Sequence, residues 1–151
     1  MDKVQQYTDT EWWILKPVPQ AALLLCILKK SGKLRAVVDC RQRNDNTIKD
    51  VTPFPDQDQI RMDIVRAKFR SKINLSNAYE QVRIEPDNVH KTGFATVYGM
   101  IESNVLQQGD CNGPATFQWL ITVIFRDAIG LYVHIYLDNL FIFSYKVVWH
   151  E

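Results

Sequence analysis

The chain has 151 residues, 46% of them hydrophobic, which suits one globular domain with a sizeable core. Its net charge is only +1, so total charge alone identifies no class of partner. The three cysteines are odd in number and far apart, which argues against a disulfide framework or a zinc site and favours a reducing environment.

The N-terminus is polar and acidic, unlike a signal peptide. The apolar run 21–28 is too short to cross a membrane. We therefore expect an intracellular protein, in the cytoplasm or nucleus, with no membrane partner.

In chain order, residues 1–8 are predicted to be poorly ordered. A short helix is expected from Asp9 or Thr10 through the two tryptophans, and Pro17 would end it. The apolar runs 22–28 and 34–39 predict two strands joined by a turn. Residues 41–55 predict a polar connection.

Asp56 is a candidate cap for a helix whose apolar face includes Ile60 and Ile64. A strand is predicted over 69–74 and a helical turn over 76–81. Alternating residues predict a further hairpin around Tyr98 and Gly99.

The longest predicted helix begins after Asn112, a candidate cap, with Pro114 in its first turn, and ends at Gly130. Strands 131–136 and 140–143 then form a hairpin with Asp138 at its apex. Asn139 suits such a turn, since asparagine tolerates positive φ.

Five ordered blocks resemble those of reverse transcriptases, most of all the gypsy-type LTR retrotransposon enzymes. They are Lys33–Arg41, Lys72–Gln81, Lys91–Gly99, Asn112–Gln118 and Ile135–Phe143. The resemblance implies an α+β fold: one domain over 1–151, with fingers at about 14–70 and palm at about 71–151, and an antiparallel sheet backed by helices. No thumb or ribonuclease H domain is expected within the chain.

The resemblance also implies where catalysis would occur. The family binds Mg²⁺ with three aspartates, and their positions are occupied here by Asn74, Asp138 and Asn139. Mg²⁺ prefers anionic oxygen ligands, and only Asp138 supplies one. We expect little or no metal binding and a catalytically inactive site. Asp110 is a candidate on the substrate side but no convincing replacement.

Further positions match family residues that contact the incoming nucleotide. Tyr79 matches the aromatic residue under the sugar, and Gln108 and Gly109 match a pair lining the pocket. The bases that match triphosphate-binding residues are Lys29 or Lys30 and Arg35. The alternatives are a core tyrosine, a loop that needs glycine and a merely basic hairpin tip.

Basic residues are unevenly distributed. Residues 1–91 hold sixteen of the eighteen Lys and Arg but twelve of the seventeen Asp and Glu. One cluster is Lys29, Lys30, Lys33, Arg35, Arg41 and Arg43, and another is Arg61, Arg66, Lys68, Arg70 and Lys72. Clusters of this kind are typical of phosphate contact, although ordinary solvated surfaces also carry them.

The sequence thus predicts an inactive reverse transcriptase fragment that retains contact with a primer–template nucleic acid. The alternatives are a weak polymerase and a structural or dimerisation module. A homodimer is expected because the apolar segment Leu140–Phe143, continued by Tyr145 and Val147–Trp149, would lie at a sheet edge. In the alternative monomer, 147–149 fold back over the sheet.

Overall fold

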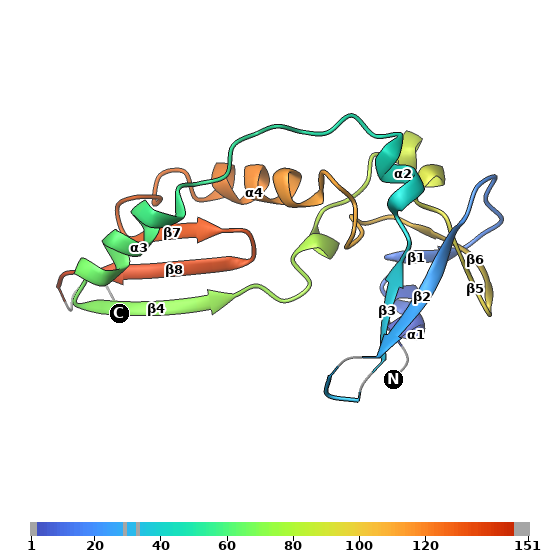
Figure 1. Ribbon diagram of the computed structural model, residues 1–151, viewed down its shortest axis with the longest axis horizontal. Helices are drawn as coiled ribbons and strands as arrows, with labels where there is room; N and C mark the ends of the chain where they lie inside the picture. Colours follow the sequence, from blue (N-terminus) through green and yellow to red (C-terminus); the bar gives the residue numbers. More distant parts are fainter. Residues whose placement is uncertain (1–2, 29, 33, 147–151) are drawn as a thin grey trace. The chain divides into compact units, whose positions relative to one another are not determined.

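The structure is a computed structural model that describes residues 3–28, 30–32 and 34–146. The chain forms two compact units, each built from two separate segments (Figure 1). Unit 1 comprises Met1–Lys49 and Tyr79–Gly113, and unit 2 comprises Asp50–Ala78 and Pro114–Glu151. The units therefore interleave along the sequence, whereas the fingers and palm bounds given above stay a prediction.

Unit 1 is organised around a five-stranded sheet with the order β1-β6-β5-β2-β3. Its strands are β1 (Trp13–Leu15), β2 (Ala22–Leu28), β3 (Leu34–Val38), β5 (Phe94–Thr96) and β6 (Gly99–Ser103). Only the β2–β5 contact is parallel, and it covers just Ala22 and Leu23. The rest of β2 pairs with β3 as a two-stranded hairpin. Both hairpins predicted in this part of the chain are confirmed.

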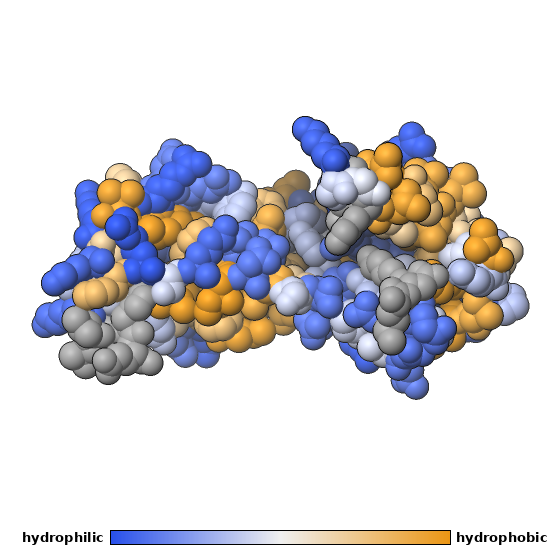
Figure 2. Space-filling model, turned by 90° about the horizontal axis from the view of Figure 1, so that it is seen from below, coloured by the Kyte–Doolittle hydropathy of each residue, from blue (hydrophilic) through white to orange (hydrophobic). Residues whose placement is uncertain are grey.

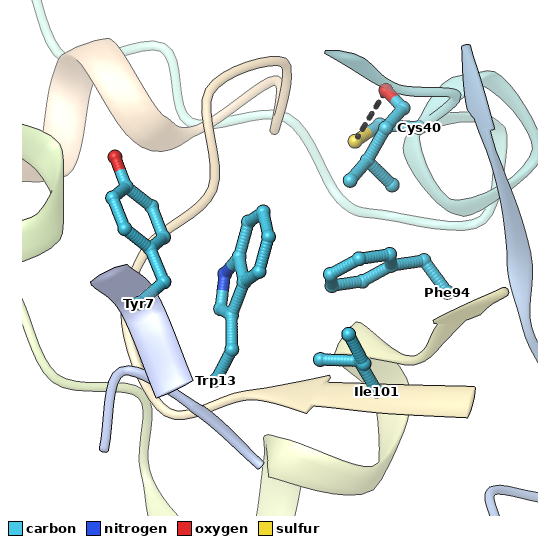
Figure 3. Packing of buried hydrophobic residues seen from close by; sticks show 6 residues of the cluster. Tyr7, Trp13, Cys40, Phe94 and Ile101 are labelled. Atoms are coloured by element: carbon cyan, nitrogen blue, oxygen red, sulfur yellow. Dashed lines mark hydrogen bonds between the residues drawn. The ribbon is translucent and has the colours of Figure 1, made fainter. Parts of the chain in front are cut away.

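The N-terminal predictions are wrong. Helix α1 (Lys3–Asp9) occupies the segment expected to be poorly ordered, and a strand replaces the helix expected at the tryptophans. The reason is packing: Tyr7 and Trp13 are 4% and 6% exposed, and the Trp13 ring lies between those of Tyr7 and Phe94 (Figure 3). The centroid of the Trp13 ring lies 4.6 Å from that of Tyr7 and 4.8 Å from that of Phe94. Edge-to-face aromatic packing of this kind stabilises the core.

The segment between β3 and unit 2 also differs from the prediction. Helix α2 (Arg41–Asp45) forms where a polar connection was expected. Two short 3₁₀ helices, η1 (Tyr79–Gln81) and η2 (Pro86–Thr92), complete unit 1, and η1 lies within the predicted helical turn.

Unit 2 contains a three-stranded sheet with the order β4-β8-β7, which Figure 1 shows with β8 in the middle. Its strands are β4 (Phe69–Asn74), β7 (Val133–Tyr136) and β8 (Asn139–Ser144), and its helices are α3 (Gln57–Arg66) and α4 (Gly113–Ile124). Asp56 caps α3 as predicted, because its side chain accepts from the backbone N–H groups of Asp58 and Gln59.

The central position of β8 corrects the argument for a dimer. Each β8 residue pairs with β4, from Phe69 opposite Ser144 to Asn74 opposite Asn139. Four of these β8 residues also pair with β7. Leu140–Phe143 is therefore no sheet edge, and within the described residues the edges are β4 and β7. Residues 147–149 lie outside the described residues.

Helix α4 ends earlier than predicted. It stops at Ile124, and tighter turns follow, in which the Ala128 N–H donates to the Phe125 carbonyl. Gly130 has a φ of +80° and follows these turns rather than the helix. The helix begins at Gly113, directly after Asn112 as predicted, and the Asn112 side-chain amide donates to the Ile48 carbonyl. The capping role of Asn112 stays a prediction. No helix in the described part of the chain is long and apolar enough to span a membrane.

Candidate functional site

The tip of the β7–β8 hairpin is a two-residue turn. Tyr136 pairs with Asn139, which leaves Leu137 and Asp138 as the loop. Leu137, with a φ of +54°, adopts the left-handed conformation that was expected of Asn139. The correction follows from loop length, because two-residue hairpin loops need positive φ in the loop itself and Asn139 already belongs to β8.

Helix α4 holds this strained turn in place. The Gln118 side chain, only 5% exposed, accepts from the Leu137 N–H at 2.7 Å. Its amide nitrogen donates to the Ile135 carbonyl at 3.4 Å and to Thr122 Oγ1 at 3.1 Å. A left-handed conformation costs a non-glycine residue roughly 1–2 kcal/mol. A buried side chain that bonds both the end of β7 and the loop residue itself offsets that cost.

The sheet register brings the three predicted catalytic positions together. Asn74 is the last residue of β4 and lies opposite Asn139, the first of β8. The Leu75 N–H donates to the Asp138 carbonyl at 2.8 Å, which fixes the β4 end against the turn. Positions 64 residues apart in sequence thereby share one corner of unit 2.

At this tip the two asparagines bond to the aspartate. Asn139 Nδ2 donates to Asp138 Oδ1 at 2.8 Å, and Asn74 Nδ2 reaches Asp138 Oδ2 at 3.4 Å. Asn74 Nδ2 also donates to Asn139 Oδ1 at 3.1 Å. A carboxylate only accepts hydrogen bonds, so both amides turn an N–H toward it. Each carboxylate oxygen thus accepts a hydrogen bond from an amide.

This donor set does not fit the Mg²⁺ ions that reverse transcriptases normally use. Mg²⁺ needs several hard oxygen ligands in near-octahedral geometry. Here the amide nitrogens face the one carboxylate, and no group of three or more His, Cys, Asp or Glu side chains suited to a metal occurs among the described residues.

Unit 1 brings together part of the predicted nucleotide-binding set. Arg35 Nη2, on β3, donates to Gln108 Oε1 at 3.0 Å, and both side chains are exposed. Gly109 has a φ of +115°, and a Cβ there would lie 3.3 Å from Cys40 Sγ, so this loop requires glycine. Lys30 is exposed in the β2–β3 turn, whereas Lys29 lies outside the described residues.

Tyr79 belongs to unit 1, as the first residue of η1, and is half-buried. A Cβ built on Gly113 would lie 3.5 Å from Tyr79 Cε1, so the ring packs closely against the start of α4. Asn74, Asp138 and Asn139 belong to unit 2. The predicted site residues therefore form two clusters, one in each unit.

Asp110 is bound within unit 1 instead of standing as an isolated acid. It forms a short ion pair with Arg43, whose Nη2 also donates to Gln107 Oε1 at 2.7 Å. The Arg43 and Asp110 side chains are 21% and 17% exposed. Arg43 Nη2 also contacts Cys40 Sγ, and burial raises the pKa of that thiol to about 11. All three cysteines are free.

Sequence reasoning missed a buried pair in unit 1. Tyr7 Oη donates to Glu80 Oε1 at 2.6 Å, and Glu80 is only 5% exposed. Burial and the Glu80 carboxylate raise the pKa of Tyr7, which keeps its proton as the donor. Glu80 Oε2 is buried without a hydrogen-bond partner, and Glu80 lines a cavity of about 30 Å³ with Trp13 and Gln107. No local sequence signal joins residues 73 positions apart.

Comparison with known proteins identifies the family. Residues 27–148 match the reverse transcriptase (RNA-dependent DNA polymerase) family. Two Drosophila melanogaster relatives are Retrovirus-related Pol polyproteins. That from transposon 297 is 30% identical over 138 residues, covering 91% of this chain and 12% of its own length. The polyprotein from transposon opus is 33% identical over 117 residues, which cover 76% of this chain and 12% of that polyprotein. The chain thus spans about an eighth of these relatives.

Solved structures agree on the fold. The foamy viral protease–reverse transcriptase dRH in complex with double-stranded DNA matches with a TM-score of 0.86 and 24% identity, covering 97% of this chain and 26% of the other. The foamy viral protease–reverse transcriptase in complex with an RNA/DNA hybrid gives a TM-score of 0.86 and 21% identity. The match covers 96% of this chain and 19% of the viral chain. Both support the predicted α+β palm-and-fingers fold. The chain therefore belongs to the reverse transcriptase (RNA-dependent DNA polymerase) family.

Proposed function

We propose that this fragment of a retrotransposon reverse transcriptase domain binds nucleic acid but does not polymerise it. One observation carries the proposal: Asn74 and Asn139 turn their amide nitrogens toward Asp138. In this reading Asp138 is the remaining catalytic carboxylate, with degenerate partners on either side.

The energetic consequence is large. Two unit charges about 4 Å apart interact by roughly 4 kcal/mol at an effective dielectric near 20. Each 1.4 kcal/mol corresponds to about tenfold in rate. Losing one carboxylate that acts in the transition state therefore costs on the order of a thousandfold, and two of three are replaced here.

Nucleic-acid binding does not depend on those carboxylates. The foamy viral relatives of this fold are described in complex with double-stranded DNA and with an RNA/DNA hybrid. The contact between Arg35 and Gln108 is exposed, and Tyr79 and Gly109 keep the residue types expected of a nucleotide pocket. We assign these residues, with Lys29 or Lys30, to contact with a nucleotide or primer–template.

Two measurements test the proposal. A labelled primer–template should bind in an anisotropy titration, whereas extension in Mg²⁺ or Mn²⁺ should not exceed background. Templated incorporation that Asp138→Ala abolishes would contradict catalytic silence. Absence of binding at low salt would contradict the proposed nucleic-acid contact.

Mg²⁺ calorimetry provides the matched comparison. Asn74→Asp combined with Asn139→Asp restores two charges and should raise the affinity for Mg²⁺ over that of the unchanged chain. Gln20→Glu combined with Ser31→Asp adds the same charge at separate exposed positions of unit 1 and should not. Tight Mg²⁺ binding by the unchanged chain would show that the amides do not exclude the metal.

A further inference from the structure

The free edge of the unit 2 sheet carries basic side chains without acidic partners. Arg70 and Lys72 lie on β4, and Lys68 directly precedes it. All three are exposed, and none forms an ion pair with any described residue. We call these three residues the β4 basic edge. Figure 2 shows hydrophilic side chains projecting from the surface beside apolar ones.

The other bases of unit 2 lie near acids, with the exception of Lys146, which follows β8. Arg61 pairs with Asp58 at 3.2 Å, and Arg126 contacts Asp127 at 3.6 Å. Arg66 lies in the last turn of α3, where a cation is favourable, and helps to lower the pKa of Asp63. The uncompensated charge of this unit is therefore concentrated along β4.

The strand geometry arranges this charge. Residues two apart in a strand point to the same face and lie about 6.6 Å apart, at a rise of 3.3 Å per residue. Arg70 and Lys72 therefore share one face. With Lys68 directly before β4, these side chains form an extended basic row along which a sugar–phosphate backbone can lie.

An aromatic ring accompanies the charge. Phe141 lies opposite Lys72 in the register, and Lys72 Nζ is 5.5 Å from its ring centroid. Phe141 is only half-buried although it lies on the central strand. A basic side chain beside a partly exposed aromatic ring, along an extended basic edge, is the combination that single-stranded nucleic-acid sites use.

We propose that the β4 basic edge binds the sugar–phosphate backbone of a nucleic-acid strand, with Phe141 available for base stacking. The proposal rests on the nucleic-acid binding proposed above and names a surface for it in unit 2. A further β-strand is a poorer occupant, because basic side chains along an edge oppose strand addition. An acidic polypeptide offers negative charge but no nucleobases to stack on Phe141. The experiment below therefore tests it as a competitor.

The experiment is an anisotropy titration of a fluorescein-labelled oligothymidylate over a salt series. Replacing all three residues of the β4 basic edge with serine should reduce the slope of log K against log salt by about 2, at roughly 0.7 per single-strand phosphate contact. Arg61→Ser, Arg66→Ser and Arg126→Ser together form the control, because these bases lie near acids. They remove the same charge from exposed positions of the same unit and should leave the slope unchanged.

Two further variants keep the test decisive. Exchanging Lys for Arg and Arg for Lys at the three positions retains the charge and should retain the slope, even if the serine variant folds poorly. Phe141→Leu should weaken binding on the order of tenfold with little change in slope, because base stacking does not depend on salt in the same way.

The outcomes separate the two proposals. If the unchanged chain binds and the serine variant, correctly folded, keeps its slope, the β4 basic edge is not the surface, although nucleic-acid binding stands. If the unchanged chain binds no oligonucleotide, both proposals fail. If poly-glutamate competes as well as unlabelled oligothymidylate, the edge is a general anion site and the nucleic-acid assignment is wrong.

Discussion

Two polar clusters of the molecule use similar hydrogen bonds in opposite settings. In unit 1, Tyr7 and Glu80 are bonded at 2.6 Å, and both residues are at most 5% exposed. In unit 2, Asn74, Asp138 and Asn139 bond to one another at an open hairpin tip, where Asn74 is exposed. Polar groups at the tip can exchange these bonds for water, whereas the buried pair cannot.

The comparison separates structural from functional residues. A buried hydrogen-bonded pair is strongly destabilising to break, because the remaining polar group has neither a partner nor solvent. An exposed network contributes little to stability, so its residues can be exchanged at low cost to the fold. Amides at positions 74 and 139 are therefore compatible with an intact sheet in unit 2.

Breaking the buried pair should have the largest effect. Tyr7→Phe removes the donor and leaves both Glu80 oxygens without a partner, so we expect a loss of about 3 kcal/mol in the free energy of unfolding. Urea denaturation measures it.

The partner change supplies the control for Tyr7→Phe. Glu80→Gln removes the charge, so Tyr7→Phe in that background should cost less than in the unchanged chain. Equal costs in both backgrounds would mean that the Glu80 charge is not what makes Tyr7 necessary.

The next effect concerns the turn that carries Asp138. Gln118→Leu removes the acceptor of the Leu137 N–H and leaves a strained residue without support. We expect a loss of about 2 kcal/mol. The matched control is Trp119→Leu on the same helix, which is 60% exposed and should change stability far less. Similar losses in both variants would indicate a general effect on α4.

Much of the fold follows from local sequence. The β2–β3 strands, the Asp56 cap of α3 and the hairpin carrying Asp138 were all predictable, because apolar runs, capping residues and turns act over a few positions. The ordered motifs also allowed the family to be recognised. They placed Asn74 beside Asp138 before any geometry was known.

The remaining features depend on distant contacts. Helix α1 forms where Tyr7 packs on Trp13 and reaches Glu80, and β8 becomes central because β4 pairs with it from 65 to 75 residues away. Leu137 takes the positive φ because it lies in the two-residue loop, where Gln118 of α4 bonds its N–H. Local propensity favours asparagine at such a position, and tertiary context overrode it.

A smaller effect should appear in acid, at the contact between α3 and β7. Hydrogen bonds from Gln59 and then His134 lower the pKa of Asp63. Because the folded pKa lies below the unfolded one, this contribution is present above about pH 4 and is lost as the pH falls through the folded pKa. Urea midpoints of the unchanged chain and Asp63→Asn should therefore differ at pH 6 and converge toward pH 3. A constant difference would exclude Asp63 as the titrating group.

The smallest effect is expected at the tip itself. Asn74→Ala removes two amide contacts, of 3.1 Å and 3.4 Å, from an exposed side chain. Water can replace both, so the free energy of unfolding should change by less than about 0.5 kcal/mol. Thermal and urea denaturation at neutral pH measure the change. A loss comparable to that of Tyr7→Phe would mean that the tip amides are structural. Asparagine at position 74 would then stabilise the sheet, and its presence would no longer be explained by the absence of a metal site.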